Sequence, residues 1–168
     1  MPGEARSIER STLDLREKRL LPVDEPDVAR VEVTTPALSY TLARDGSAWR
    51  LDSPPGGKAD EGTASRVVAA ARLLRALQFL PGGGDPGRAL ERPAWRVRVV
   101  DAKGAAHAVS IAQGTAAGKA SEPRPLYARA DGASEIARLA DGAQKDLEQT
   151  ASSLQDKTAP DAGSVTRP

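Results

Sequence analysis

Apolar and polar residues alternate along several short stretches of the chain, which is the two-residue period of a half-buried strand. The alternation predicts a strand over residues 29–33, and it returns over residues 38–43 and 49–51. Between the last two stretches, Asp45 and Gly46 form a turn dipeptide. The first third of the chain is therefore expected to form a strand followed by a hairpin.

The same two-residue period returns in the second half of the chain. It predicts a hairpin whose strands cover residues 95–99 and 107–111, with a turn over residues 101–104. Two more short strands are expected over residues 126–130 and 134–139, on either side of an Asp-Gly turn. This half is therefore expected to add about four antiparallel strands.

Between these two strand regions the period changes to that of a helix. Apolar residues fall on one helical face at four positions: Val67, Ala70, Leu74 and Leu77. Asp60 or Thr63 is expected to cap this helix, which is predicted to run to about Phe79 and to end at Pro81. Its apolar face predicts that the helix lies against the sheet.

Two further segments complete the predicted fold. Residues 82–87 are predicted to form a glycine and proline loop, and residues 141–157 a weak second helix. The order of elements predicts an α+β fold, in which two helices pack on an antiparallel β-sheet built from hairpins. Residues 13–157 are expected to form this single domain, with polar tails over residues 1–12 and 158–168.

Composition narrows the classes of function. The chain has 168 residues, which suits one domain, and its 24 basic residues nearly balance 23 acidic ones. That balance, together with an aromatic content of only 3%, predicts no nucleic-acid partner. The lack of cysteine excludes disulfides and thiolate metal sites. No apolar run is long enough to cross a bilayer, so this segment is not expected to insert into a membrane.

Three stretches together resemble the family named domain of unknown function 4340. They are residues 14–22 (DLREKRLLP) running into residues 27–33 (DVARVEV), residues 46–54 around Trp49-Arg50-Leu51, and residues 90–93 (LERP) with the later residues 126–129 (LYAR). The similarity extends over roughly residues 13–157 and lies in the order and spacing of the stretches. Ala89 departs from the family pattern, which usually has glycine before the Leu-acid-Pro turn.

The resemblance implies a repeat-forming domain of the bacterial cell envelope, on its periplasmic side, with an anchor outside this stretch. It also implies a protein partner, either a component of an ABC-type transport system of the gliding-motility kind or a neighbouring repeat. It supplies no catalytic residue and no cofactor. Residues 15–18 (LREK) recur in type as residues 154–157 (LQDK), so residues 158–168 are interpreted as the start of a further unit.

Candidate catalytic groups are few. His107 is the single histidine, and a general base needs a positioned partner that no motif here supplies. Gly82, Gly84 and Gly87 satisfy G-x-G-x-x-G, but they follow a predicted helix and lack the context that binds phosphate. The acidic turn at residues 24–27 lacks the calcium-loop pattern. We predict a non-enzymatic domain without a cofactor or metal, and a hydrolase-like enzyme with a site near His107 stays open as an alternative.

Charge is uneven along the chain. Residues 66–98 hold seven arginines and two acidic residues, whereas residues 131–161 hold seven acidic and three basic residues. These stretches either present a basic docking surface or neutralise each other, within the fold or between successive repeats.

Strand parity selects four candidate contact residues for a protein partner. Arg96 and Arg98 are predicted on the outward face of their strand, opposite the inward Trp95. Tyr127 and Arg129 share one parity on a later strand, and they extend this face if that parity is outward. Aromatic and guanidinium groups of this kind are enriched at protein interfaces. We predict that this face contacts an acidic segment of a partner.

The positions of the two tryptophans bear on another alternative, a module that binds cell walls or carbohydrates. Such modules use exposed aromatic platforms, whereas Trp49 and Trp95 have core-facing parity in their strands. Both rings are therefore predicted to anchor the core.

Overall fold

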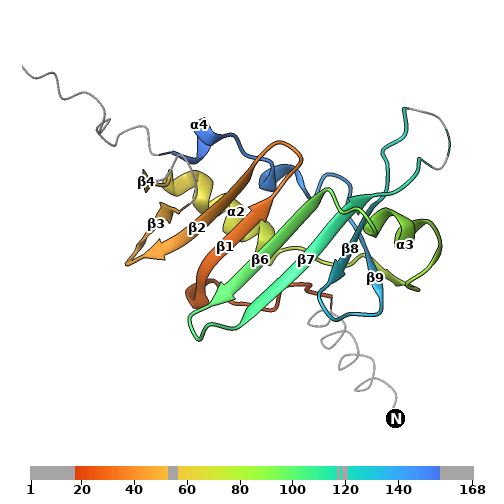
Figure 1. The fold of residues 1–168 in the computed structure, drawn as a ribbon, viewed down its shortest axis with the longest axis horizontal. Coiled ribbons are helices and arrows are strands. Elements are labelled where there is room, and N and C mark those ends of the chain that lie inside the picture. The colour runs from red at the N-terminus through yellow and green to blue at the C-terminus, as the bar shows by residue number, and fades with distance from the viewer. Residues whose placement is uncertain (1–17, 53–56, 117, 119–120, 156–168) are drawn as a thin grey trace, which may run out of the picture.

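One antiparallel sheet forms the body of the structure, a computed structural model that describes residues 18–52, 57–116, 118 and 121–155. These residues form nine strands in the order β4-β3-β2-β1-β6-β7-β8-β9-β5 (Figure 1). The strands are β1 (Val28–Thr34), β2 (Ser39–Asp45), β3 (Ala48–Leu51), β4 (Gly57–Lys58), β5 (Gln78–Leu80), β6 (Trp95–Asp101), β7 (Ala106–Gln113), β8 (Leu126–Ala130) and β9 (Ile136–Leu139). The predicted α+β class and antiparallel sheet are confirmed.

The long strands follow the alternation of the sequence. At the centre of the sheet, β1 pairs with β6, so that Val31 lies opposite Val99 and Val33 opposite Val97. All four side chains are buried. Because side chains alternate between the two faces of a strand, the polar residues between these valines lie on the other face. Both β1 and β6 therefore have one apolar and one polar side.

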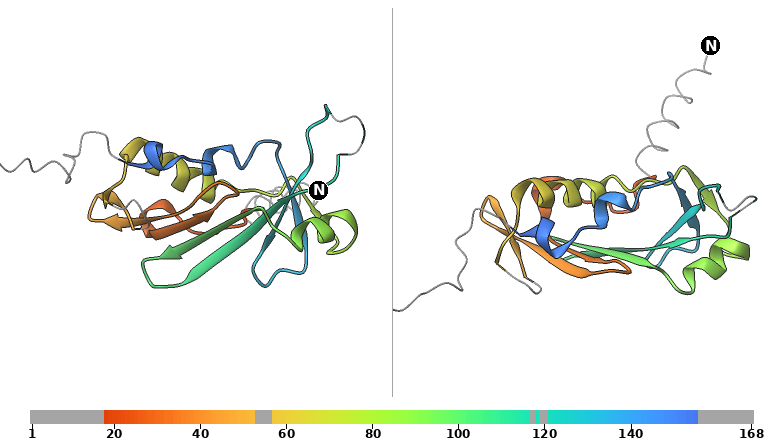
Figure 2. Two further views of the ribbon diagram at one scale, coloured as in Figure 1. Left: turned by 45° about the horizontal axis from the view of Figure 1, so that its top comes forward. Right: turned by 90° about the horizontal axis from the view of Figure 1, so that it is seen from above.

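Helix α2 (Glu61–Arg72) covers the apolar face, which we call the inner face; the opposite one is the outer face. The Asp60 side chain caps the helix by accepting a hydrogen bond from Thr63 N at 2.8 Å, as the sequence predicts. Three residues of the helix, Val67, Val68 and Ala71, are buried. Since β4 and β5 are the two edge strands, the chain between them crosses the width of the sheet (Figure 2).

The predicted end of this helix is wrong. The apolar period suggests a helix to about Phe79, but α2 ends at Arg72, and residues 78–80 form the edge strand β5. Pro81 therefore follows a strand and does not end a helix.

Pairing with distant segments explains this difference. The Leu74 carbonyl accepts a hydrogen bond from Leu20 N at 3.0 Å, and Leu77 N donates to the Arg138 carbonyl at 2.7 Å. These partners draw the backbone out of the helix, although the local period favours it. Leu77, which the helical pattern places on the buried face, is 62% exposed.

Residues 82–87 do not form only the predicted loop, because the helix α3 (Gly84–Leu90) begins within them. Pro86 lies in its first turn, where a missing N–H is tolerated because these groups have no acceptor within the helix. The helix contacts β7 and β8 from the outer face, opposite to α2 (Figure 2). Proline is thus part of the start of this helix.

The C-terminal segment is also corrected, because the single helix predicted over residues 141–157 is absent from its described part. Lys145–Leu147 forms the short 3-10 helix η2, and Ala151–Leu154 forms the single turn α4. The buried Tyr40 hydroxyl donates a hydrogen bond to the Leu147 carbonyl at 2.6 Å. In a continuous helix this carbonyl would accept a hydrogen bond from the N–H four residues later, whereas here it points towards the sheet.

The core lies on the inner face, between the sheet, α2 and the C-terminal segment. Trp49 and Trp95 are only 3% and 6% exposed, which confirms that both anchor the core. Burial raises the pKa of Tyr40 above its ordinary value. The tails expected over residues 1–12 and 158–168 lie outside the described residues.

Candidate functional site

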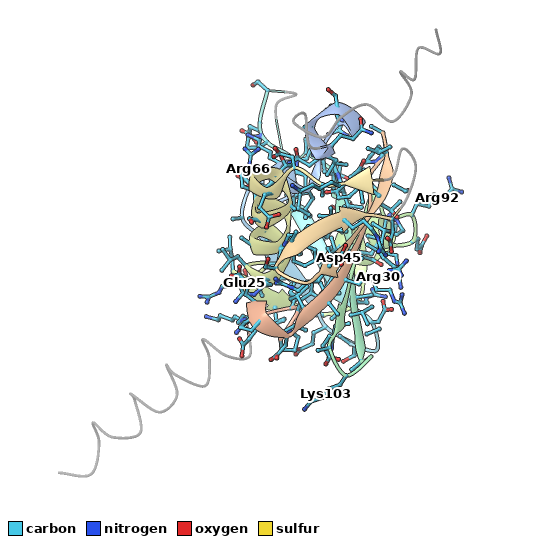
Figure 3. The ribbon with its side chains drawn as sticks, turned by 90° about the vertical axis from the view of Figure 1, so that its left-hand side faces the viewer. Glu25, Arg30, Asp45, Arg66, Arg92 and Lys103 are labelled. Carbon is cyan, nitrogen blue, oxygen red and sulfur yellow. The ribbon has the colours of Figure 1, made fainter. Side chains whose placement is uncertain are left out.

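The outer face carries ion pairs that run across neighbouring strands. Glu32 pairs with Arg30 at 3.1 Å and with Arg98 at 3.0 Å. Asp52 pairs with Arg50 at 2.7 Å and with Arg30 at 3.7 Å, and the Arg50 guanidinium lowers the pKa of Asp52. Arg30 projects from the side of the sheet opposite to α2 (Figure 3). This part of the face therefore mixes both signs of charge.

Two predicted contact residues, Arg96 and Arg98, are held by carboxylates of their own chain. Arg96 Nη2 lies 2.8 Å from an Asp131 carboxylate oxygen, and its Nη1 donates to Ser110 Oγ at 3.1 Å. Arg98 forms the pair with Glu32 described above. The pair of Arg96 with Asp131 joins the basic and acidic stretches of the sequence, so these stretches neutralise each other at this point.

Arg129 differs from these arginines because its guanidinium has no partner among the residues that the structure describes. In the register of the sheet, Arg129 lies opposite Ser110, which lies opposite Arg96, so two arginines flank one serine across three strands. Arg129 Nε is buried and makes no hydrogen bond, and Arg129 forms no ion pair within the described residues. A buried donor that is left unpaired is costly, and a bound acceptor removes that cost.

Tyr127 lies on the same face but is covered. It is only 9% exposed, and its ring packs so closely against Gly114 that a Cβ at that position would overlap it. Of the four predicted contact residues, Arg96 and Arg129 therefore lie in one row that runs across the strands through Ser110. Arg98 lies in the neighbouring row, opposite Ala108. The Tyr127 ring contributes packing and little open surface.

A hollow of about 440 Å³ opens beside Arg129. Its lining comes from the end of α3, from β7 and β8, and from the turn after β8: Leu90, Ser110, Arg129, Ala130, Asp131 and Gly132. We call it the Arg129 hollow. The sequence identifies Arg129 but not Leu90 or Asp131, because their approach depends on where α3 packs and on the strand register. The Asp-Gly turn is the only local signal at Asp131.

A larger hollow of about 740 Å³ lies at α3 and includes Asp85, Arg88 and Arg124 in its lining. The Asp85 carboxylate accepts hydrogen bonds from Thr115 N at 3.1 Å and from Thr115 Oγ1 at 2.7 Å. The Thr115 hydroxyl lowers the pKa of Asp85. Because this carboxylate already has two donors, it serves to hold the segment after β7 against α3.

His107 lies half-buried in β7, opposite Val99. Its imidazole ring makes no hydrogen bond or ion pair with the described residues. In the part of the chain that the structure describes, no three His, Cys, Asp or Glu residues gather where they could hold a metal ion. In the acidic turn, Glu25 pairs with Arg72 at 3.0 Å.

In comparisons with known proteins, no family model, no curated protein and no solved structure matches the chain. The resemblance to domain of unknown function 4340 therefore stays a prediction. None of the helices in the described ranges is long and apolar enough to span a membrane.

Proposed function

We propose that this protein is a non-enzymatic interaction domain that contacts a protein partner through the outer face of β6, β7 and β8. The observation that carries the proposal is Arg129, which has no partner in the described part of the chain, in one row with the half-exposed Arg96. Arginine is enriched among the residues that dominate binding at interfaces. The small side chains of Ala108 and Ser110 lie between these strands and leave room for a partner to approach closely.

The ion pairs over β1, β3 and β6 support this proposal in a different way. Their side chains are 22–54% exposed, so each pair contributes little to stability, about 0–1 kcal/mol. Ordered charges of both signs at the rim of a contact instead favour a partner with the complementary pattern and disfavour others. We assign to Arg30, Glu32 and Asp52 this role in specificity.

The cellular setting is proposed from the sequence resemblance alone. We place the domain at the cell envelope, on its periplasmic side, as an accessory to an ABC-type transport system. Its partner is then a component of that system or a neighbouring repeat of the same protein. The acidic segment that we expect on the partner has the charge opposite to that of Arg96 and Arg129 on the outer face.

The test is a double charge reversal, Arg96→Glu with Arg98→Glu, in the full-length protein. Partners are first identified by crosslinking the wild-type protein in its own cells and are then counted after co-purification with the variant. We expect the partners to be lost, because the reversal places acidic groups where an acidic segment must dock. The melting transition stays close to that of the wild type, since these are exposed ion pairs.

A matched control carries two reversals away from the outer face, Arg66→Glu on α2 and Arg75→Glu shortly after it. Arg66 is exposed on the side of the molecule that bears α2 (Figure 3). The control has the same net charge as the test variant and is expected to keep the partners. Equal recovery of the same partners with both variants would show that the outer face is not the contact surface.

A further inference from the structure

We propose that the Arg129 hollow binds one carboxylate of the partner, the side chain of an aspartate or glutamate with an apolar residue beside it. This inference rests on the proposed function, and it names the chemistry that the outer face recognises. It is argued from the unpaired guanidinium, the serine hydroxyl, the balance of charge and the apolar wall.

The guanidinium of Arg129 supplies the first ligand contact. Arg129 lines the hollow, and within the described residues its guanidinium makes no hydrogen bond or ion pair. A guanidinium presents its N–H groups in a planar fork that matches the two oxygens of a carboxylate. A carboxylate in the hollow therefore receives charge-assisted hydrogen bonds from a guanidinium that has no acceptor within the described residues.

Ser110 supplies the second contact. Its Oγ accepts a hydrogen bond from Arg96 Nη1 at 3.1 Å, so the hydroxyl proton is left to donate to a ligand. Arg96 is held in place by Asp131 at 2.8 Å. Ser110 thus lies between two arginines. Arg96 fixes the orientation of its hydroxyl, and Arg129 lines the hollow.

The balance of charge favours a ligand with a single negative charge. Arg96 and Arg129 bring two positive charges to the hollow and its border, and Asp131 brings one negative charge. One carboxylate neutralises the remaining positive charge. The charge of a phosphate dianion is larger than this remaining positive charge. A phosphate in the hollow would also be repelled by the Asp131 carboxylate.

The other lining residues indicate what accompanies the carboxylate. Leu90, Ala130 and Gly132 offer an apolar wall and no charged group. Leu90 comes from the end of α3, so the helix closes one side of the hollow. A hollow of about 440 Å³ holds an acidic side chain together with part of an apolar neighbour, which keeps water from the ion pair.

The test observes Arg129 directly, by following its Nε–Hε signal in proton–nitrogen correlation spectra of the labelled full chain. The probe is the peptide acetyl-Ala-Leu-Glu-Leu-Ala-amide, and the matched control peptide carries glutamine in place of glutamate. We expect the glutamate peptide to shift the Arg129 signal in a saturable way. All titrations use acetate-free buffer. The glutamine peptide and an equal concentration of chloride are expected to leave that signal unchanged.

Variants separate the two contacts. Arg129→Gln is expected to weaken binding of the glutamate peptide more than about tenfold, because it removes a charge-assisted hydrogen bond. Ser110→Ala is expected to weaken it about threefold to tenfold, as for one neutral donor. Arg92→Gln is the control variant, because Arg92 is exposed on the side away from α2 and lies outside the hollow (Figure 3). It is expected to bind as the wild type does.

Three results would overturn the assignment: equal shifts from the two peptides, unchanged affinity in Arg129→Gln, or a saturable shift with inorganic phosphate stronger than that with the glutamate peptide. The wild-type titration alone decides the first and third, even if a variant fails to fold. Failure of this inference is distinct from failure of the proposed function. If co-purification depends on the outer face but the peptide leaves Arg129 unchanged, the docking face stands and the carboxylate site falls.

Discussion

On the inner face of the sheet, valine, leucine and tryptophan side chains are packed beneath α2 and the C-terminal segment, whereas on the outer face of the same strands arginines alternate with carboxylates. The strand β6 shows both: Val97 and Val99 are fully buried on one side, and Arg96 and Arg98 form exposed ion pairs on the other. Burial of apolar surface gives large stabilisation, and exposed ion pairs give little. The inner face therefore holds the fold, and the outer face is free to serve binding.

The comparison also explains why α3 is a different kind of helix from α2. Beneath α2 lies the main core, whereas the buried apolar residues of the outer face form a small separate group, Ala108, Ala112, Tyr127 and Ile136. Helix α3 packs on that face against β7 and β8. One end of the outer face is thus packed, and the open remainder meets it at the Arg129 hollow.

The largest expected effect concerns the inner face. Trp49→Ala and Trp95→Ala should each lower the free energy of unfolding by about 3–5 kcal/mol, because each removes a buried ring and leaves a cavity. Urea unfolding of each variant measures the loss. Arg98→Ala, on the same strand as Trp95 but on the outer face, is the control and should lose less than about 1 kcal/mol. A loss below about 1 kcal/mol for both tryptophan variants would contradict the division between the faces.

A smaller effect is expected where the inner face holds the C-terminal segment. Tyr40→Phe removes only the hydroxyl that donates to the Leu147 carbonyl. We expect a loss of about 1 kcal/mol, because this carbonyl keeps a second hydrogen bond from Gln149 N at 3.1 Å. Chemical unfolding measures it, and hydrogen exchange of the amides of η2 and α4 shows where the protection falls. Faster exchange in β8 but not in α4 would refute this role of Tyr40.

The smallest effect concerns the exposed carboxylates. The pKa values of Asp52 and Asp85 are lowered by Arg50 and by Thr115. A carboxyl whose pKa is lower in the folded state stabilises the fold above its unfolded pKa, near 4, and this stabilisation is lost as the pH falls through the folded pKa. Stability should therefore fall slightly more steeply below about pH 4 in the wild type than in Asp52→Asn with Asp85→Asn.

Unfolding midpoints between about pH 7 and about pH 3 measure this difference. Arg50→Gln gives an independent control, because it leaves Asp52 in place and removes the partner that lowers its pKa. It should reproduce part of the flattening. The same pH profile in the wild type and the double variant would mean that these two carboxylates do not contribute.

The elements that local sequence specifies were predictable. The alternation in β1, β2, β6 and β7 depends only on neighbouring residues, and so do the Asp60 cap and the outward parity of Arg96 and Arg98. Elements decided by distant partners were not. The end of α2 depends on Leu20 and Arg138, and the break between η2 and α4 on Tyr40.

The same distinction holds for the candidate site. Parity places Arg96 and Arg129 on one face, but it does not tell which arginine is paired. That depends on Asp131, which pairs with Arg96, whereas Arg129 has no partner within the described ranges. Leu90 enters the hollow only because α3 folds onto the sheet where glycine and proline suggest a loop. Sequence alone therefore identifies Arg129 as a candidate contact residue, and the tertiary structure shows which groups surround it.

The central pairing of β1 with β6 has a consequence for how the chain reaches its fold. On one side of this pair, β4, β3, β2 and β1 are neighbours in both sequence and space, and on the other side so are β6, β7, β8 and β9. Each group can assemble from local hairpins. Joining them closes a loop that contains α2, β5 and α3, and such non-local closure slows folding because its entropy is lost before its contacts form. We therefore expect the formation of the sheet to be limited by its non-local pairings, that of β1 with β6 at the centre, where Val31 meets Val99, and that of β5 with β9 at the edge.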